Sequence, residues 1–576
     1  MFTPRKILIA LLAVSMLAAE LMPARSSAQE APTTGAYCLA LPGPNEIICN
    51  TDGTFTFKFW VKNVSSFPAG SMTFSSVSPA GVTITPSPAP LNPLLAVNGT
   101  RQIAVKISGP GAVPGATVCF SVGIRDRGNL NCCTATQRIC IILPECSSRA
   151  CASGICCAKA PEYTDPAYAS FLGKKVAVVT TLDNPVEVIN LSGITGATPT
   201  GVNYNAPRYR GPNNSWSRDN LGSVFGVTLD EHGNIYVAAT SAYGATFGSA
   251  QDLYPNGSGR VYKIDNGTGA ISLFALLPNF QDPAIAMDFP SEAYPGLGNI
   301  SYDCKYQQLF VTNHEDGKIY RLSISGTTLE TFDPFGADNN APGFAPLDQR
   351  LWGVQVHNNR VYYSRWREDC GNPRSNVNNE VWSVALNSGA FVPASNRLEL
   401  TAPDLAGANF SNPISDISFS SDGKMLLGER TMMNYPGKPG FTSATFSNAH
   451  ASRVLEYSCS IEVPRWKLTP AYTTFPYRFN IGILASSGCN IPSAGLPANA
   501  AGGVDYDYDL STTSPFKVWA TGDALKFQAN MFVYGIQGLK PTGGDAATSI
   551  LIDTNGNVSD GDKTEIGDVE ISCPDL

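Results

Sequence analysis

The sequence predicts an all-β chain, and three observations support this. Short segments rich in valine, isoleucine and aromatic residues recur along most of its 576 residues. Glycine (53) and proline (42) are plentiful, which is typical of a chain with many turns. Charged residues make up only 15% of the chain, whereas an average soluble domain has about 25%. The length also exceeds what one domain normally holds, so we expect more than one domain.

Six segments of one pattern recur in the C-terminal two-thirds of the chain. Each has a small or turn-forming residue followed by a β-branched, a polar and a large apolar residue. They lie at 225–229, 298–302, 352–356, 415–419, 502–506 and 566–571. Five begin a unit of antiparallel strands, which is a propeller blade, while the partners of 566–571 lie far upstream at 175–179 and 186–189. The sequence therefore predicts a six-bladed β-propeller that is closed by pairing the C-terminal strand with strands of the N-terminal blade.

A smaller β-sandwich is expected before the ring, over residues 29–145. Its segment 101–107 alternates strictly between apolar and polar residues, as a half-buried strand does. Several short strands at this spacing indicate an immunoglobulin-like sandwich. Residues 146–172 show little periodicity and contain four cysteines, so we expect a Cys-rich linker there. The propeller then occupies residues 173–576.

The first 28 residues have the pattern of a secretory signal peptide. Arg5 and Lys6 precede an apolar run that ends at Ala19, and small residues follow up to Ala28. The run is too short and wrongly flanked for a membrane span, so cleavage is expected near Ala28. No later apolar run is long enough to cross a bilayer. We therefore expect a secreted or periplasmic protein.

Cysteine content and net charge narrow the class further. Fifteen cysteines in an exported chain predict disulfides, and ten of them fall between Cys38 and Cys157. The zinc alternative normally requires Cys-x2-Cys pairs, which the sequence lacks. A net charge of −8, without a run of Lys or Arg, argues against a nucleic-acid partner.

Two blade segments, residues 226–237 and 416–427, resemble the six-bladed propellers of the NHL and SMP-30/gluconolactonase superfamily. The resemblance is a repeated blade pattern that extends over about 400 residues, and it implies a six-bladed propeller fold. A lactonase of that superfamily binds a divalent cation through Glu, Asn and Asp near the channel. The glutamate-bearing motif on its first strand is absent from this sequence.

The strand that lines the axis of each blade needs small residues because six strands crowd together there. The corresponding column is Gly226, Asn299, Gly353, Asp416, Gly503 and Asp568. Its three polar members can bind a cation or a polar ligand in the channel. Alternatively, they cap the starts of their own strands, as Asn and Asp commonly do.

Long loops are expected on one face of the ring, where binding residues usually concentrate. These loops, with the loop that precedes Val224, are rich in Arg and aromatic residues. The predicted ligand-binding residues are Arg208, Trp216, Tyr243, His314, Arg365, Trp366 and Arg430. This combination suits a carbohydrate, an anionic group or a protein ligand. The alternative is that the loops simply pack on each other.

Candidate catalytic residues are few. His314 begins a loop on the same face and is the best general-base candidate, because an imidazole titrates near working pH. Glu429 occupies the equivalent place in another blade. Neither has a visible catalytic partner in the sequence, and no serine-hydrolase or zinc-protease motif occurs.

The segment that starts at Asp553 begins like a calcium-binding EF-hand loop. Its oxygen-bearing residues are Asp553, Asn555, Asn557, Asp560 and Asp562. Oxygen ligands at alternate positions suit calcium, although Val558 stands where the motif has Gly and Glu565 comes one residue late. The alternative is a solvated acidic turn.

These observations favour an exported protein that binds a carbohydrate, anionic or protein ligand with its long-loop face. One alternative is a divalent-cation-dependent hydrolase or lyase that acts in the channel, similar to a lactonase. Another is a structural component of a cell surface or matrix.

Overall fold

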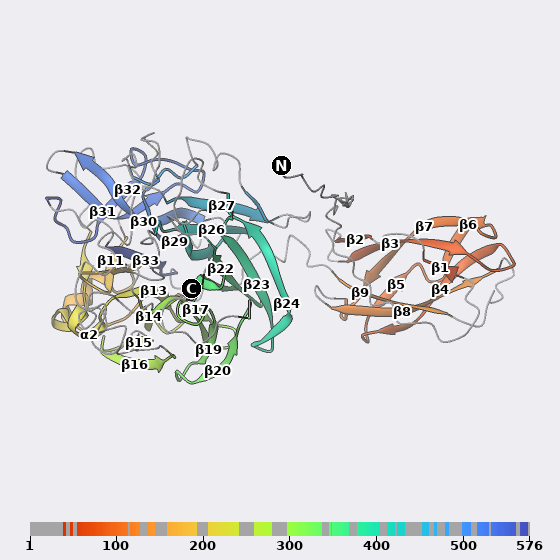
Figure 1. Ribbon diagram of the computed structural model, residues 1–576, viewed down its shortest axis with the longest axis horizontal. Helices are drawn as coiled ribbons and strands as arrows, with labels where there is room; N and C mark the ends of the chain where they lie inside the picture. Colours follow the sequence, from red (N-terminus) through yellow and green to blue (C-terminus); the bar gives the residue numbers. More distant parts are fainter. Residues whose placement is uncertain are drawn as a thin grey trace, which may run out of the picture. The chain divides into compact units, whose positions relative to one another are not determined.

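The computed structural model divides the chain into two compact units, Met1–Cys146 and Ser147–Leu576 (Figure 1). Each unit is described by itself below. The structure describes residues 39–41, 46–49, 54–112, 116–126, 136–143, 158–192, 206–240, 243, 259–278, 296–336, 345–346, 348–367, 377–403, 412–420, 423–432, 452–459, 466–468, 478–482, 498–508, 515–528, 531–559 and 565–573. The predicted signal peptide lies outside these residues. Among the described residues, no helix has the length and apolar character needed to span a membrane.

The first unit is a sandwich of two antiparallel sheets. One sheet contains β1 (Leu39–Ala40), β2 (Glu46–Cys49), β3 (Phe55–Asn63), β5 (Thr83–Thr85) and β7 (Thr100–Ser108). The other contains β4 (Ala69–Ser78), β6 (Ala89–Leu95), β8 (Thr117–Arg125) and β9 (Gln137–Ile142).

The sandwich core follows from the period-two alternation of its strands. Phe57 and Phe59 of β3 are buried, while Lys58 between them is partly exposed on the other face of the sheet. Phe120 of β8 meets Phe57 from the opposite sheet at a centroid distance of 6.0 Å. A disulfide joins Cys119 to Cys140 across the paired strands β8 and β9. The two sheets therefore enclose a single aromatic core.

The second unit contains six four-stranded antiparallel sheets among the described residues. The first sheet is β12 (Arg208–Tyr209), β11 (Glu187–Asn190), β10 (Val176–Thr181) and β33 (Ile566–Ile571). The next two are β13 (Val224–Leu229), β14 (Ile235–Ala239), β15 (Arg260–Ile264), β16 (Ile271–Leu276), and β17 (Leu297–Asp303), β18 (Gln308–Asn313), β19 (Ile319–Ser323), β20 (Thr328–Phe332).

The remaining three sheets repeat this strand order. They are β21 (Arg350–His357), β22 (Arg360–Trp366), β23 (Glu380–Asn387), β24 (Ala390–Thr401); β25 (Ile414–Phe419), β26 (Lys424–Glu429), β27 (Val454–Cys459), β28 (Trp466–Leu468); and β29 (Ala500–Tyr508), β30 (Pro515–Gln528), β31 (Met531–Leu539), β32 (Ile550–Asp553). The short helices η1 (Pro166–Phe171), η2 (Pro212–Asn214) and α2 (Arg218–Leu221) lie beside the first blade.

The sheets form a closed ring, which confirms the all-β propeller prediction. We call β13, β17, β21, β25, β29 and β33 the inner strands, because each neighbours the next around the axis and β33 neighbours β13. The predicted closure is present, since β33 pairs antiparallel with β10, with Val178 opposite Glu570. Figure 1 shows β33, in blue, beside the yellow strands of the N-terminal blade.

A repeated hydroxyl group ties most of the blades to the next one. In four sheets a Ser or Thr at one position of the second strand donates a hydrogen bond to the inner strand of the following blade. These donors are Thr180, Thr312, Ser364 and Thr521, at 2.5–2.8 Å from their carbonyl acceptors. In β26 that position is Gly428, and Ser415 donates to the carbonyl of Gly502 instead, at 3.1 Å.

Part of the predicted linker packs on the propeller. Tyr163 and Tyr168 are buried against Tyr209 of β12, at centroid distances of 5.4 and 4.9 Å. Residues 158–172 therefore pack on the first two blades of the propeller, while 146–157 lie outside the described residues.

We expect deletion of residues 564–576 to unfold the ring. The deletion removes β33, so β10 loses its inner partner and two sheet edges become exposed. Thermal unfolding and size-exclusion chromatography of the truncated chain should show loss of the propeller transition or aggregation. A truncated chain that melts at the temperature of the intact chain would contradict the closure.

Candidate functional site

Three polar side chains meet at the axis of the propeller. Asn299, Asp416 and Asp568 stand on alternate inner strands, and a glycine occupies the equivalent position on each strand between them. Asn299 Nδ2 donates to Asp416 Oδ1 at 3.1 Å, and the Asp416 and Asp568 carboxyl groups share a hydrogen bond. A Cβ at Gly226 would lie 2.6 Å from Asn299 Oδ1, so the glycines make room for this triad.

The triad carboxyl groups also bind backbone amides of neighbouring blades. Asp416 accepts the amide of Val504 at 2.8 Å, and Asp568 accepts the amide of Val227 at 3.2 Å. Asp416 also accepts the amide of Ile417 in its own strand, at 2.7 Å. These side chains therefore cap their own strands and at the same time connect adjacent blades.

Two more carboxyl groups lie on the inner strands, each two residues beyond the axial position of its strand. Asp505 accepts a hydrogen bond from Ser418 Oγ at 2.6 Å, and Glu570 follows Asp568 by two residues on the same strand. Burial raises the pKa of Asp416 to about 6 and that of Asp505 to about 7. Burial also raises the pKa of Asp568 and of Glu570 well above the ordinary carboxyl range. The channel is therefore lined by carboxyl groups that hold protons at mildly acidic pH.

An aromatic layer closes the long-loop end of the channel. We call it the mouth layer, and it consists of Phe225, Tyr243, His314, Trp352, Trp366 and Arg430. Arg430 is 1% exposed and donates from one Nη to the carbonyls of Ala501 and Ile566, both at 2.6 Å. Its guanidinium lies 5.3 Å from the Tyr243 ring and 5.6 Å from the Phe225 ring. Burial lowers the pKa of Arg430.

Trp352 continues this layer across the channel. Its ring is 5.3 Å from that of Phe225, 4.9 Å from His314 and 5.8 Å from Trp366. The structure thus brings together four of the seven predicted ligand-binding residues: Tyr243, His314, Trp366 and Arg430. All four are at most 2% exposed, so their substitution will affect packing as well as any ligand.

Two predicted ligand-binding residues lie elsewhere, in the first blade. Trp216 is 1% exposed among Tyr163 and Tyr209, and its Nε1 donates to the carbonyl of Gly269 at 2.8 Å. Arg208 lies 3.8 Å from the carboxylate of Glu187. Both side chains make structural contacts within the described residues.

The catalytic candidate Glu429 is held by a buried arginine. Its carboxylate accepts two hydrogen bonds from the Arg453 guanidinium, at 2.7 and 2.8 Å, and one from the Arg453 amide at 3.0 Å. Both side chains are nearly inaccessible. This geometry is that of a structural ion pair, in which the carboxylate is already fully engaged.

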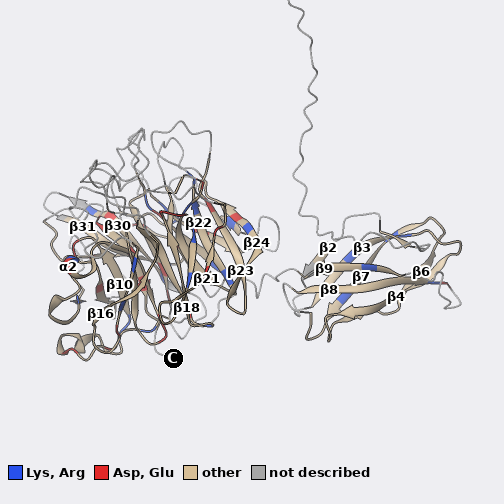
Figure 2. Ribbon diagram, turned by 60° about the horizontal axis from the view of Figure 1, so that its bottom comes forward, with Lys and Arg blue, Asp and Glu red and all other residues tan. Residues whose placement is uncertain are grey.

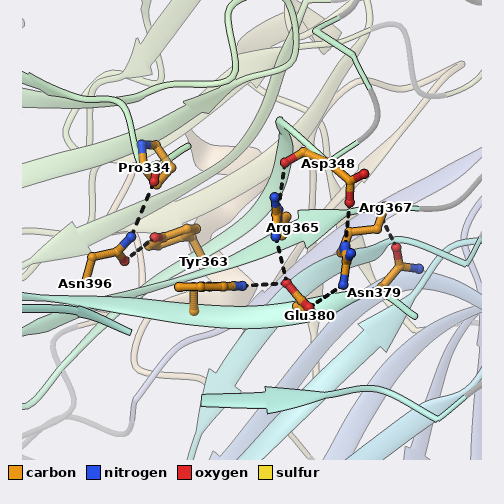
Figure 3. Close-up of polar contacts among 9 residues, drawn as sticks. Pro334, Asp348, Tyr363, Arg365, Arg367, Asn379, Glu380 and Asn396 are labelled. Atoms are coloured by element: carbon orange, nitrogen blue, oxygen red, sulfur yellow. Dashed lines mark hydrogen bonds and ion pairs between the residues drawn. The ribbon is translucent and has the colours of Figure 1, made fainter. Parts of the chain in front are cut away.

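Arg365, the seventh predicted residue, lies in a polar network that reaches solvent (Figure 3). Glu380 accepts hydrogen bonds from Arg365 at 3.2 Å, from Trp382 Nε1 at 2.8 Å, and from Arg367. Arg367 also bridges to Asp348, whose side chain is 49% exposed. We call these five residues the Arg365 network.

Aromatic rings pack against one side of the Arg365 network. The Arg365 guanidinium stacks 3.9 Å from the Phe335 ring, which meets Trp382 edge-on at 5.2 Å. The sequence analysis did not predict Asp348, Glu380 or Trp382 as site residues. Glu380 meets Arg365 because the two residues are opposite each other in the paired strands β22 and β23. A long loop joins these strands, so their register cannot be read from the sequence.

The predicted calcium segment is described in part, because Asp560 and Asp562 lie outside the described residues. Asp553 Oδ1 accepts the Tyr534 amide at 3.2 Å, whereas its buried Oδ2 accepts no hydrogen bond. Asn555 and Asn557 accept backbone amides two residues further on. No group of three or more His, Cys, Asp or Glu side chains in the described part of the chain is arranged for a metal ion. The unsatisfied Oδ2 is the feature that fits a cation ligand.

Comparison with known proteins adds no family assignment. No protein-family model matches the chain, and no curated protein matches it. Similar solved structures include a nidogen/laminin complex (10% identity, 70% of this chain and 100% of that chain, TM-score 0.34). Others are a protein from Lactobacillus plantarum (9%, 69% and 99%, 0.33) and a hypothetical selenium-binding protein from Sulfolobus tokodaii (9%, 79% and 90%, 0.35). The function must therefore be argued from the residues of this chain.

We expect Asp568→Asn to flatten the pH dependence of stability. The raised carboxyl pKa values mean that the folded chain binds more protons than the unfolded chain from about pH 4 to about pH 7. Stability from these groups is therefore fully present at the acidic end of this window and falls as the pH rises. Asn cannot ionise, so the loss between pH 5 and pH 8 should shrink by roughly 1–3 kcal/mol, because each pKa unit by which folding raises a carboxyl group corresponds to about 1.4 kcal/mol.

Chemical denaturation at both pH values measures this change. Asp183→Asn, at an exposed turn, is the matched control and should leave the pH dependence as it is. If the stability of Asp568→Asn depends on pH as strongly as that of the wild type, the triad does not bind the extra protons of the folded chain.

The calcium prediction concerns Asp553. We expect added calcium to raise the melting temperature, because an ion that binds only the folded chain stabilises it, and we expect a chelator to reverse the shift. Asp553→Asn removes one carboxylate charge and should abolish the increment in a thermal-shift measurement. If neither calcium nor chelator moves the transition of the wild-type chain, the segment is an acidic turn.

Proposed function

We propose that the chain is an exported binding protein whose ligand contacts the long-loop end of the propeller at the Arg365 network. The observation that carries the proposal is partial exposure. Arg365 and Arg367 are 19% and 25% exposed, whereas the mouth-layer residues beside the channel are buried. The network also stands where β22 ends and a long loop begins, which is where binding residues concentrate on rigid scaffolds.

The chemistry of the network suits a ligand with many hydrogen-bonding groups. Two guanidinium groups face two carboxylates, so the charges balance and the surface offers donors and acceptors in fixed positions. Phe335 and Trp382 add flat apolar surface next to them. A carbohydrate meets both conditions. A protein ligand is the other fit, because Arg and Trp dominate protein hot spots.

The blade pattern supports the NHL or SMP-30-like superfamily as the family that we propose. An enzyme of that kind, a hydrolase or lyase acting in the channel, is the second candidate function. Four channel carboxyl groups with raised pKa values favour it, since perturbed carboxyl groups are common in active sites. Their hydrogen bonds to inter-blade amides favour a structural role for at least Asp416 and Asp568.

A glycan array followed by titration tests the binding proposal. We expect Arg367→Ala to weaken binding by roughly 1–3 kcal/mol, as truncation of a hot-spot arginine does. Stability should change little because the Arg367 side chain is partly exposed. Arg321→Ala, which removes a half-buried ion pair with Glu330 in the previous blade, is the matched control.

Two outcomes would contradict the proposal. Unchanged binding by Arg367→Ala, with loss of binding in Arg321→Ala, would place the ligand elsewhere. Turnover of a lactone or polysaccharide that is lost in Asp505→Asn but retained in Arg367→Ala would favour the channel enzyme.

A further inference from the structure

One end of the sandwich exposes a cluster of apolar side chains. Phe67 is 62% exposed, Val64 and Val97 are each 41% exposed, and Leu94 is 39% exposed. Val64 and Phe67 lie between β3 and β4, while Leu94 and Val97 lie at the end of β6 and just after it. Isolated exposed apolar residues need no explanation, but a group of them on two adjoining loops marks an interaction site. We call this group the apolar tip.

A single buried asparagine holds the two loops together. Asn63 Nδ2 donates to the carbonyl of Phe67 at 2.8 Å and to the carbonyl of Leu95 at 3.0 Å. Its backbone carbonyl accepts the amide of Asn98 at 2.8 Å. Every residue of the apolar tip is therefore within one residue of a group that Asn63 binds.

The loop that carries Val64 and Phe67 is also internally fixed. Ser65 donates from its hydroxyl to Asn63 Oδ1 at 2.7 Å, and the Ser65 amide donates to the same oxygen at 3.0 Å. The Ser65 hydroxyl also lies 2.8 Å from the carbonyl of Phe67. The side chains of Asn63 and Ser65 thus turn inward, while those of Val64 and Phe67 face solvent.

Charged side chains are absent from the loops of the apolar tip, and the nearby strand ends carry cations. Residues 64–68 and 89–99 contain no charged side chain at all. Cations stand at the strand ends behind them, with Lys62 next to Asn63, Arg101 two residues after Gly99, and Arg125 opposite Ser71 at the start of β4.

The sandwich as a whole is basic. Residues 39–143 have seven Lys and Arg against three Asp and Glu, a net charge of +4, although the full chain has −8. Figure 2 shows Lys and Arg on several strands of the sandwich and little Asp or Glu there. This basic unit is therefore the part of the chain suited to a negatively charged surface.

We propose that the apolar tip inserts into the surface of an anionic lipid bilayer, with the cations behind it contacting the headgroups. An uncharged apolar tip enters the acyl boundary without desolvating an ion, and basic residues next to it are attracted by the negative surface potential. Rigid presentation by Asn63 and Ser65 means that insertion does not first require the loops to be ordered. The interaction is peripheral, at the surface of the bilayer.

Flotation of the full chain with lipid vesicles tests the proposal. We expect the protein to float with phosphatidylcholine vesicles that contain about 30 mol% phosphatidylglycerol and to stay behind with pure phosphatidylcholine. Phe67→Ser combined with Val97→Ser should lower the bound fraction about tenfold, because each loses its buried hydrocarbon. Lys62→Gln and added salt should each weaken binding, because both reduce the electrostatic part.

Leu329→Ser is the matched control, because Leu329 is 49% exposed on β20 of the propeller. It should bind vesicles as the wild type does. The tip variants should keep the wild-type melting temperature, which separates loss of binding from loss of fold. Several outcomes would overturn the proposal: no flotation with anionic vesicles, equal flotation with neutral ones, or an equal loss in Leu329→Ser. A soluble protein partner that is captured through Phe67 without vesicle binding would also overturn it.

Discussion

The antiparallel pairing of β33 with β10 is the interaction on which the propeller depends. Five of the six described propeller sheets are each built from one continuous stretch of chain, so they need no distant partner. The remaining sheet joins strands almost four hundred residues apart, with Ala177 opposite Ile571. The axial contacts of Asp568, including its hydrogen bond with Asp416, require that this sheet be complete, because Asp568 lies on β33.

Glycine and polar residues share the axis in a fixed alternation. Six strands converge there, and six side chains larger than glycine would not fit at one level, as the short distances around Gly226 and Gly503 show. Polar groups fill the remaining places because the inner strands have inter-blade amides to satisfy. The raised pKa values of the carboxyl groups are then a consequence of closing the ring, and they need no substrate to explain them.

Much of the fold could be predicted from the sequence, whereas little of the site could. The strand at 566–571 and its partner near 175–179 share a recognisable pattern, and the column with Asn299 and Asp416 follows from it. Trp366 and Arg430 were predicted from their residue type and their place on the long-loop face, and neither shows that these side chains turn into the mouth layer. Their burial is set by neighbours such as Trp352. Partners such as Glu380 likewise depend on register across a long loop, which the sequence does not fix.

The order in which the strands are made has a kinetic consequence. The chain emerges from the ribosome or a translocation channel from its N-terminus, so β10 waits unpaired on its inner side until β33 has followed all other blades. During that interval the incomplete ring has two open sheet edges, which are the usual templates for aggregation. Long-range strand pairing is also slow to form. The yield of folded protein should therefore depend on how well those edges are protected from aggregation before synthesis ends.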